Sequence, residues 1–135
     1  MLKDANLYWS FPKDSLIGWN MKNLGPLYIP KKGDVMEMNR QNAIIYGKLI
    51  EWETGKKLSI ESNGNILLDN SRIAGYFFRK DYYFVARDRI EDSRDSRYWG
   101  LLPEEFIIGK AILIWKSMNP LTNEIRWDRV CRRID

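Results

Sequence analysis

The stretch YYFVARDRIEDSRDSRYWG, residues 82–100, decides how the rest of this sequence is interpreted. It opens with an aromatic run typical of a β-strand, and a second aromatic segment, YFF, precedes it across Lys80 and Asp81. Basic and acidic residues then alternate, and the stretch closes on Tyr98, Trp99 and Gly100. This part of the chain therefore predicts two consecutive strands followed by a polar segment with an aromatic end.

The residues after this stretch predict further strands. KAILIWKSM, residues 110–118, is apolar at consecutive positions, which is typical of a strand that is covered on both faces. EIRWDRV, residues 124–130, alternates apolar and charged side chains, which favours a half-exposed strand.

The residues before it predict one helix and one hairpin. Apolar residues recur at helical spacing within residues 40–53, where Asn39 is a candidate N-cap and Gly55 a candidate C-cap, although Gly47 weakens the pattern. Asn63 and Gly64 separate two short apolar runs, and both residue types tolerate the positive φ of a tight hairpin turn. The fold class predicted is mainly β, with antiparallel sheets and one short helix near residues 40–53.

Length and composition predict a single domain. At 135 residues and 44% apolar content the chain is long enough to bury a core. Residues 1–30 mix aromatic residues with Gly and Pro, so we expect an extended aromatic arm packed on a β domain that covers residues 31–135.

The same composition excludes several kinds of chemistry. The chain has no histidine, so no Ser-His-Asp or Cys-His mechanism can operate. Its one cysteine, Cys131, allows neither an internal disulfide nor a cysteine-based metal site. The longest apolar runs are far shorter than the ~20 residues that a spanning helix needs. We therefore expect no membrane span or targeting signal in this chain.

Residues 82–111 resemble the last conserved box of the type I signal peptidases, or leader peptidases. Their pattern is approximately Y-F-V-M-G-D-N-R-D-N-S-x-D-S-R-Y-W-G-x-V-P-E-x-x-I-V-G-K-A, and the resemblance is long, ungapped and specific. Upstream, LGPLYIPKKGDVMEM and the arm before it look like the C-terminal half of the Bacteroidetes-type enzymes, and NGNILLDN is similar to a short family strand. The likeness covers most of the chain from about Phe11 onward.

The resemblance implies a β-rich fold and an extracytoplasmic serine protease of the plasma membrane that removes signal peptides. Such enzymes use a serine nucleophile and a neutral lysine as general base, a chemistry that needs no histidine. The family's nucleophile lies in an S-M-x-P box that precedes the other boxes. SMNP, residues 117–120, spells this box, but it follows the last one, so we interpret Ser117 as a strand-end residue and Pro120 as part of a turn.

No general base can be assigned by resemblance either. If PKKGD, residues 30–34, corresponds to the family's P-G-D turn, the lysine should lie about eight residues before Asp34, where this chain has Pro26. Lys22 is out of register, and Lys31 and Lys32 lie inside the turn. The sequence therefore predicts no catalytic residue, and this chain alone is expected to be inactive.

The wall of the active site transfers position by position. Ser93 matches the family serine near the general base, Asp95 the aspartate behind it, and Arg97 the arginine that pairs with this aspartate, while Asp88 keeps the aspartate of G-D-N-R. Departures from the pattern affect the half that faces the chemistry, with Arg87 for glycine, Arg89 for asparagine and Ile90 for arginine. An arginine in place of glycine is expected to crowd this region.

Three interpretations stay open. The chain is either a catalytically silent relative or the C-terminal piece of a longer enzyme; alternatively, it is a peptide-binding or scaffolding module that kept the fold. The expected partners are a signal peptide or another extended segment, a membrane surface, or a catalytic partner segment. No cofactor, metal or nucleic acid is expected, because the arginines alternate with the acids of residues 88–95 and compete for their carboxylates.

Overall fold

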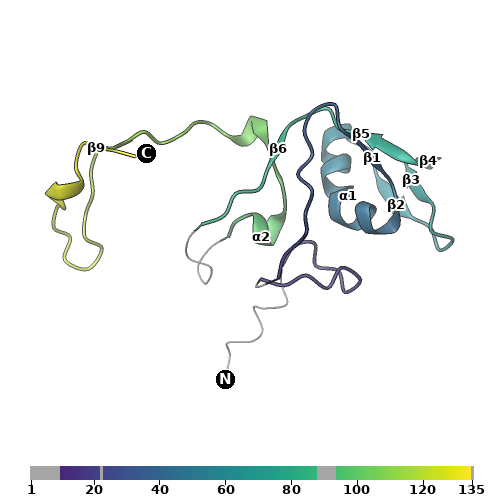
Figure 1. Cartoon of the computed structure of the whole chain (residues 1–135), viewed down its shortest axis with the longest axis horizontal. Coiled ribbons are helices and arrows are strands. Elements are labelled where there is room, and N and C mark those ends of the chain that lie inside the picture. Colours follow the sequence, from purple (N-terminus) through teal and green to yellow (C-terminus); the bar gives the residue numbers. More distant parts are fainter. Residues whose placement is uncertain (1–9, 22, 88–93, 135) are drawn as a thin grey trace, which may run out of the picture.

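The computed structural model describes residues 10–21, 23–87 and 94–134 of the chain. Within them the elements are β1 (Val35–Glu37), α1 (Arg40–Thr54), β2 (Leu58–Ile60), β3 (Ile66–Leu68), β4 (Ser71–Arg72), β5 (Gly75–Phe77), β6 (Tyr82–Tyr83), α2 (Ser96–Trp99), β7 (Leu102–Pro103), η2 (Glu104–Phe106), β8 (Leu113–Ile114), η3 (Trp127–Arg129) and β9 (Arg132–Arg133). The strands pair antiparallel as β1 with β5, β2 with β3 and β4, β6 with β7, and β8 with β9 (Figure 1). The mainly β fold class is confirmed.

The long helix forms where its caps predict. The side chain of Asn39 accepts a hydrogen bond from the backbone N–H of Asn42, and Gly55 ends the helix with a left-handed φ of 69°. Gly47 lies on its buried face, where an added Cβ would stand 3.4 Å from a methyl group of Leu58 in β2. The glycine that weakens the helical pattern thus allows the helix and the β2–β4 sheet to approach closely.

The β1–β5 ribbon separates a buried face from an exposed one. Met36 pairs with Tyr76 and both pack on the core, whereas the next pair, Val35 with Phe77, is 75% and 55% exposed. One residue further along, Phe78 is fully buried and contacts the rings of Tyr76, Tyr46 and Tyr82 edge-on. The hairpin predicted at Asn63 and Gly64 is present between β2 and β3.

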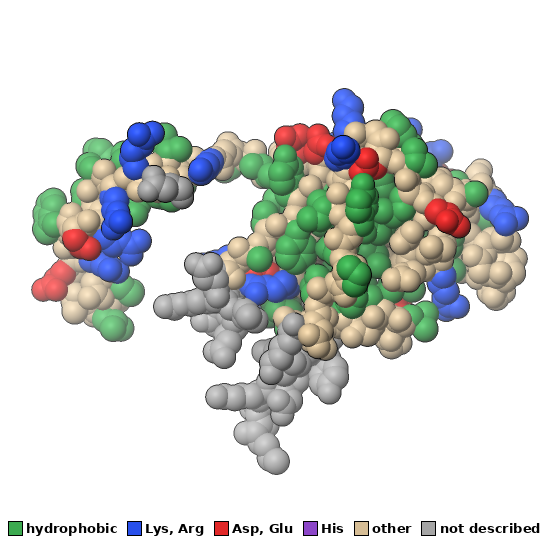
Figure 2. All heavy atoms as spheres, in the orientation of Figure 1, with side chains coloured by type: hydrophobic (Ala, Val, Ile, Leu, Met, Phe, Trp, Pro, Cys, Tyr) green, Lys and Arg blue, Asp and Glu red, His purple; other side chains and the backbone are tan. Residues whose placement is uncertain are grey.

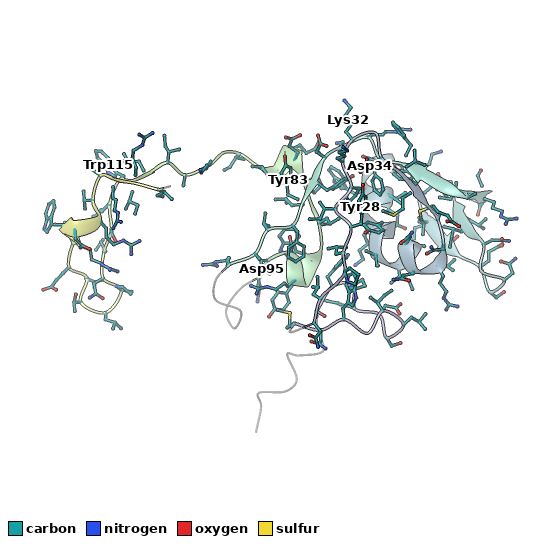
Figure 3. All side chains as sticks on the ribbon, viewed as in Figure 1. Tyr28, Lys32, Asp34, Tyr83, Asp95 and Trp115 are labelled. Atoms are coloured by element: carbon teal, nitrogen blue, oxygen red, sulfur yellow. The ribbon has the colours of Figure 1, made fainter. Side chains whose placement is uncertain are left out.

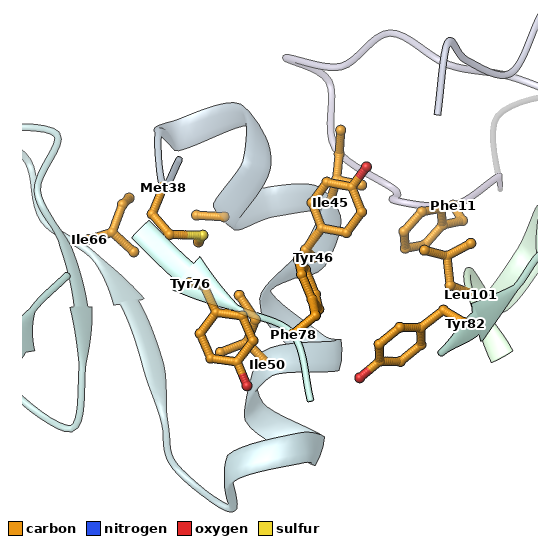
Figure 4. Packing of buried hydrophobic residues seen from close by; sticks show 11 residues of the cluster. Phe11, Met38, Ile45, Tyr46, Ile50, Ile66, Tyr76, Phe78, Tyr82 and Leu101 are labelled. Carbon is orange, nitrogen blue, oxygen red and sulfur yellow. The ribbon is translucent and has the colours of Figure 1, made fainter. Parts of the chain in front are cut away.

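The core joins the helix, both of these sheets and the arm (Figure 4). Its buried apolar residues are Phe11, Met38, Ala43, Ile45, Tyr46, Ile50, Ile66, Tyr76, Phe78, Tyr82 and Leu101. Burial of apolar area on this scale is the main source of folding free energy. The part of the chain from residue 10 to Pro103, which we name the body, contains every described residue that is buried.

The arm is fixed at its Phe11 end. The backbone N–H of Phe11 donates to the carbonyl of Arg97 at 2.7 Å, and its ring covers Gly100. Gly100 has a φ of +93°, and a Cβ there would lie 2.6 Å from the ring of Phe11. The aromatic arm therefore packs directly on Arg97 and Gly100.

The C-terminal hairpin, residues 110–134, extends away from the body (Figure 1). The expectation of a strand covered on both faces over residues 110–118 is wrong for this structure. Only Leu113 and Ile114 form strand β8, Trp115 is 79% exposed, and none of these residues belongs to the core cluster of the described chain.

The prediction of a half-exposed strand over residues 124–130 is also wrong. Ile125 forms only an isolated bridge with Met118, and Trp127–Arg129 is a single 3-10 turn. The strand that pairs with β8 is β9, at Arg132–Arg133. In the 3-10 turn that precedes β9, the backbone N–H of Val130 donates to the carbonyl of Trp127.

Candidate functional site

Asp95, which Figure 3 labels, forms a buried, bidentate ion pair with Arg97 at the start of α2. Arg97 donates from Nε to Oδ1 of Asp95 at 2.9 Å and from its terminal nitrogen to Oδ2 at 2.5 Å. Asp95 is also the N-cap of α2, where its carboxylate accepts the backbone N–H of Arg97 at 3.1 Å. The exposed fractions of the two side chains are only 4% and 12%. The pair is thus both a charge-assisted contact and a helix cap.

The same pair fixes the backbone of Arg87, on the other side of residues 88–93. The Arg87 N–H donates to Oδ2 of Asp95 at 3.0 Å, and its carbonyl accepts from Arg97 at 3.0 Å. The hydrogen bonds from Arg97 are the main reason that the pKa of Asp95 falls from 3.8 to about 2, and the Arg87 N–H adds to the effect. The carboxylate therefore stays ionised in the folded protein. It binds the backbone N–H groups of Arg87 and Arg97, which lie on either side of residues 88–93.

Ser96 adds a second closure beside the pair. Its hydroxyl accepts the backbone N–H of Val85 at 3.0 Å, and its own N–H donates to the Val85 carbonyl at the same distance. Ser96 is fully buried. No role was predicted from the sequence for Ser96, the serine of the D-S-R triplet, which these two hydrogen bonds to Val85 place beside the ion pair.

Two of the four predicted wall residues lie outside the described residues. Asp88 and Ser93 fall within residues 88–93, so their place in the site stays a prediction. Arg87 is described: it is exposed, and it is not among the described residues that adopt a positive φ. Its backbone conformation therefore does not require the glycine that the family pattern has at this position.

The turn of residues 30–34 holds its lysines outward. The backbone N–H of Lys31 donates to Asp34 Oδ2 at 3.0 Å, and that of Lys32 to Asp81 Oδ1 at 2.8 Å. The hydroxyl of Tyr28 donates to Asp34 at 2.6 Å, which lowers the pKa of this carboxyl and raises that of the phenol. Both lysines are exposed, and Figure 3 shows Lys32 projecting outward, whereas a lysine general base needs a partly buried environment.

Among the described serines, Ser117 and Ser10 come closest to a candidate nucleophile. The backbone carbonyl of Ser117, three residues after the end of β8, accepts from the N–H of Arg126 inside the C-terminal hairpin. Ser10 lines a hollow together with Lys13, but it is 1% exposed and its hydroxyl donates to the Trp19 carbonyl at 3.0 Å. A buried hydroxyl that is used as a donor in this way stabilises the arm and is poorly placed to attack a substrate.

A carboxylate with two tyrosine partners lies in the body and was not foreseen from the sequence. Glu53, near the end of α1, accepts from the hydroxyls of Tyr76 and Tyr82 and from the backbone N–H of Arg79. Burial, followed by the charge and the hydrogen bond of Glu53, raises the pKa of both phenols far above the ordinary value. These hydrogen bonds join α1 to β5 and β6. They are tertiary contacts, so no local sequence pattern predicts them.

Neither a metal centre nor a spanning helix emerges from the described residues. No group of three or more acidic, cysteine or histidine residues in residues 10–21, 23–87 and 94–134 could hold a metal ion. None of the helices in this part of the chain is long and apolar enough to cross a membrane.

Comparison with known proteins gives a consistent result. The family model described as "Signal peptidase, peptidase S26" matches residues 29–116. Signal peptidase I of Buchnera aphidicola subsp. Schizaphis graminum is 30% identical over 134 residues, which cover 90% of this chain and 40% of that protein. Signal peptidase I of Haemophilus influenzae is 39% identical over 42% of this chain and 16% of its own length, and that of Aquifex aeolicus 53% over 27% and 14%.

The matched region therefore spans less than half the length of these relatives. No solved structure matches the chain significantly.

Proposed function

The chain belongs to the signal peptidase family, peptidase S26, and on this premise we propose that it supplies the supporting wall of a site that cleaves signal peptides. The serine nucleophile and the lysine base of this site come from another polypeptide segment. The chain is non-catalytic by itself.

One observation carries the proposal. The buried pair of Asp95 and Arg97 fixes the backbone on both sides of the polar stretch, at Arg87 and at the start of α2. By family resemblance, Ser93 and Asp88 lie between these fixed ends, and Ser93 faces the general base. A wall of this kind orients a lysine without taking part in bond cleavage, because its own groups are engaged in hydrogen bonds with each other.

The substrate is a signal peptide bound as an extended segment, and the site works at the extracytoplasmic face of the plasma membrane. Membership of the signal peptidase family supports both parts of this proposal. An extended peptide binds through backbone pairing along a sheet edge, so this chain contributes binding surface even without a nucleophile.

A first experiment tests the chain alone. The purified protein is incubated with a lipid-presented preprotein, and no product above that of buffer is expected. Ser117→Ala and Ser10→Ala serve as matched variants. A product at a small-x-small site that either variant abolishes would show that the chain has its own nucleophile and would overturn the proposal.

A second experiment tests the supporting role. In a chimera, this chain replaces the matching region of the Buchnera aphidicola subsp. Schizaphis graminum relative, and preprotein cleavage is measured. We expect cleavage, with a loss of at least ~10-fold on Arg97→Ala and little loss on Arg94→Ala, whose side chain is exposed. A folded chimera that binds preprotein but does not cleave it would favour the peptide-binding alternative instead.

A further inference from the structure

The apolar run of the C-terminal hairpin has two exposed faces. Side chains alternate along a strand, so Ile112 and Ile114 project from one face of β8 and its flanks, and Leu113 and Trp115 from the other. Ile112 is 66% exposed, Leu113 45% and Trp115 79%. A ribbon that adsorbs on a lipid surface needs only one apolar face. Two apolar faces are typical of a strand that lies inside a packed protein core.

This strand also has a free edge. The carbonyls of Ile112 and Ile114 accept backbone N–H groups from the β9 side of the hairpin, at 3.1 and 2.7 Å. In an antiparallel pair the intervening residues, Leu113 and Trp115, present their backbone groups to the opposite edge. Within the part of the chain that the structure describes, β8 pairs with β9 alone. An unpaired edge of this kind is a template for a further strand.

The hairpin carries a net positive charge, with basic side chains in excess of acidic ones (Figure 2). Its six basic residues are Lys110, Lys116, Arg126, Arg129, Arg132 and Arg133, and its two acidic residues are Glu124 and Asp128. The hairpin thus carries a net charge of +4, equal to that of the chain, and the remaining residues hold sixteen charges of each sign. Two copies of this surface would repel each other, whereas an acidic partner would be attracted.

We propose that residues 110–116 are a docking strand for an extended segment of another polypeptide, which pairs with the free edge of β8 and carries acidic residues on either side of an apolar run. Lys110 and Lys116 bracket the five apolar residues and meet these acidic flanks. That the segment belongs to the nucleophile-bearing polypeptide rests on the proposed function; the docking itself does not. The matched relatives are long enough to contain such a segment, since this chain aligns with only 40% of the Buchnera protein.

The test uses the full chain and two synthetic peptides with the same core, Ile-Thr-Val-Thr-Ile, flanked by two Glu at each end in one peptide and by two Lys in the other. Backbone amide exchange is measured residue by residue. The Glu-flanked peptide should slow the amide exchange of Leu113 and Trp115 by at least ~10-fold and bind at least ~10-fold more tightly than the Lys-flanked peptide.

Charge-reversal variants supply the matched control. The double variant Lys110→Glu, Lys116→Glu should reverse the preference between the two peptides. The same reversal at two exposed positions of the body, Lys48→Glu and Lys56→Glu, should leave it unchanged. All four side chains are exposed, so the fold of the body is expected to survive each change.

Three results would overturn the docking strand: equal or absent protection by both peptides, protection by phosphatidylglycerol vesicles in place of the Glu-flanked peptide, and protection that appears with rising protein concentration alone. The second result would identify a lipid surface, and the third a second copy of the chain. The peptide experiment measures binding and not cleavage, so its outcome is independent of the chimera. An inactive chimera with intact peptide preference refutes the proposed function and keeps the docking strand.

Discussion

The body and the C-terminal hairpin both contain apolar strand residues, but these residues are buried in the body and exposed in the hairpin. In the body, the apolar side of the β1–β5 ribbon lies on α1, and Phe78 is fully buried among three tyrosines. In the hairpin, residues that are equally apolar stay exposed, and nothing from Glu104 to Ile134 is buried. The difference indicates that the body folds on its own contacts, whereas the hairpin has the composition of a core strand without its cover.

The largest expected effect is in the body. Phe78→Ala removes a ring that is 0% exposed and should lower the free energy of unfolding by about 4 kcal/mol, because it leaves a cavity. Phe77→Ala, at the neighbouring position that is 55% exposed, should cost less than about 1 kcal/mol. Urea unfolding followed by circular dichroism gives both values. Equal losses at the two positions would mean that the body lacks the two-faced ribbon described above.

The next effect concerns the polar closure. Arg97→Ala leaves the buried carboxylate of Asp95 without its partner and should destabilise the body by about 3 kcal/mol. Arg94→Ala, an exposed arginine three residues earlier, is the matched control and should change stability by less than about 0.5 kcal/mol. If Arg97→Ala changes the free energy of unfolding as little as its control does, the ion pair of Asp95 and Arg97 does not stabilise this part of the body.

Protonation of Asp95 at low pH should weaken its ion pair with Arg97 and lower the free energy of unfolding. The folded protein holds the pKa of Asp95 at about 2, below its ordinary value of 3.8, so the unfolded chain binds the proton more readily. The stabilisation from this group is therefore complete above about pH 5 and is lost as the pH falls through 2, a total of roughly 2 kcal/mol. Subtracting the pH profile of Asp95→Asn from that of the wild type isolates this contribution. A flat difference between pH 2 and 4 would contradict the shifted pKa.

The smallest effect is expected in the hairpin. Trp115→Ser replaces a large side chain that is 79% exposed, and it should change the free energy of unfolding by less than about 0.5 kcal/mol in the isolated chain. A loss comparable to that of Phe78→Ala would mean that the body already covers the hairpin.

The same contrast separates what the sequence could predict from what it could not. The helix was foreseen because Asn39 and Gly55 are local capping signals, and the hairpin because Asn63 and Gly64 favour a tight turn. The bond of Glu53 to two tyrosines was not foreseen, since it depends on tertiary contacts.

In the candidate site, resemblance led to Asp95 and Arg97, which the structure brings together, but not to the clamping role of Ser96. The exposed state of residues 110–118 was missed for a physical reason. A pattern that is apolar on both faces reports that a strand requires cover, but not which polypeptide provides it.

Amide hydrogen exchange of the isolated chain tests the central claim most directly, namely that the body is complete and the hairpin is not. The amides of Ile50, Tyr76 and Phe78 should exchange with free energies of opening close to that of global unfolding. The amides of Cys131 and Ile134, which donate to β8 and its flank, should exchange within about 10-fold of the unprotected rate. Protection of the hairpin equal to that of the core would contradict the claim, because it would show a strand pair that needs no partner.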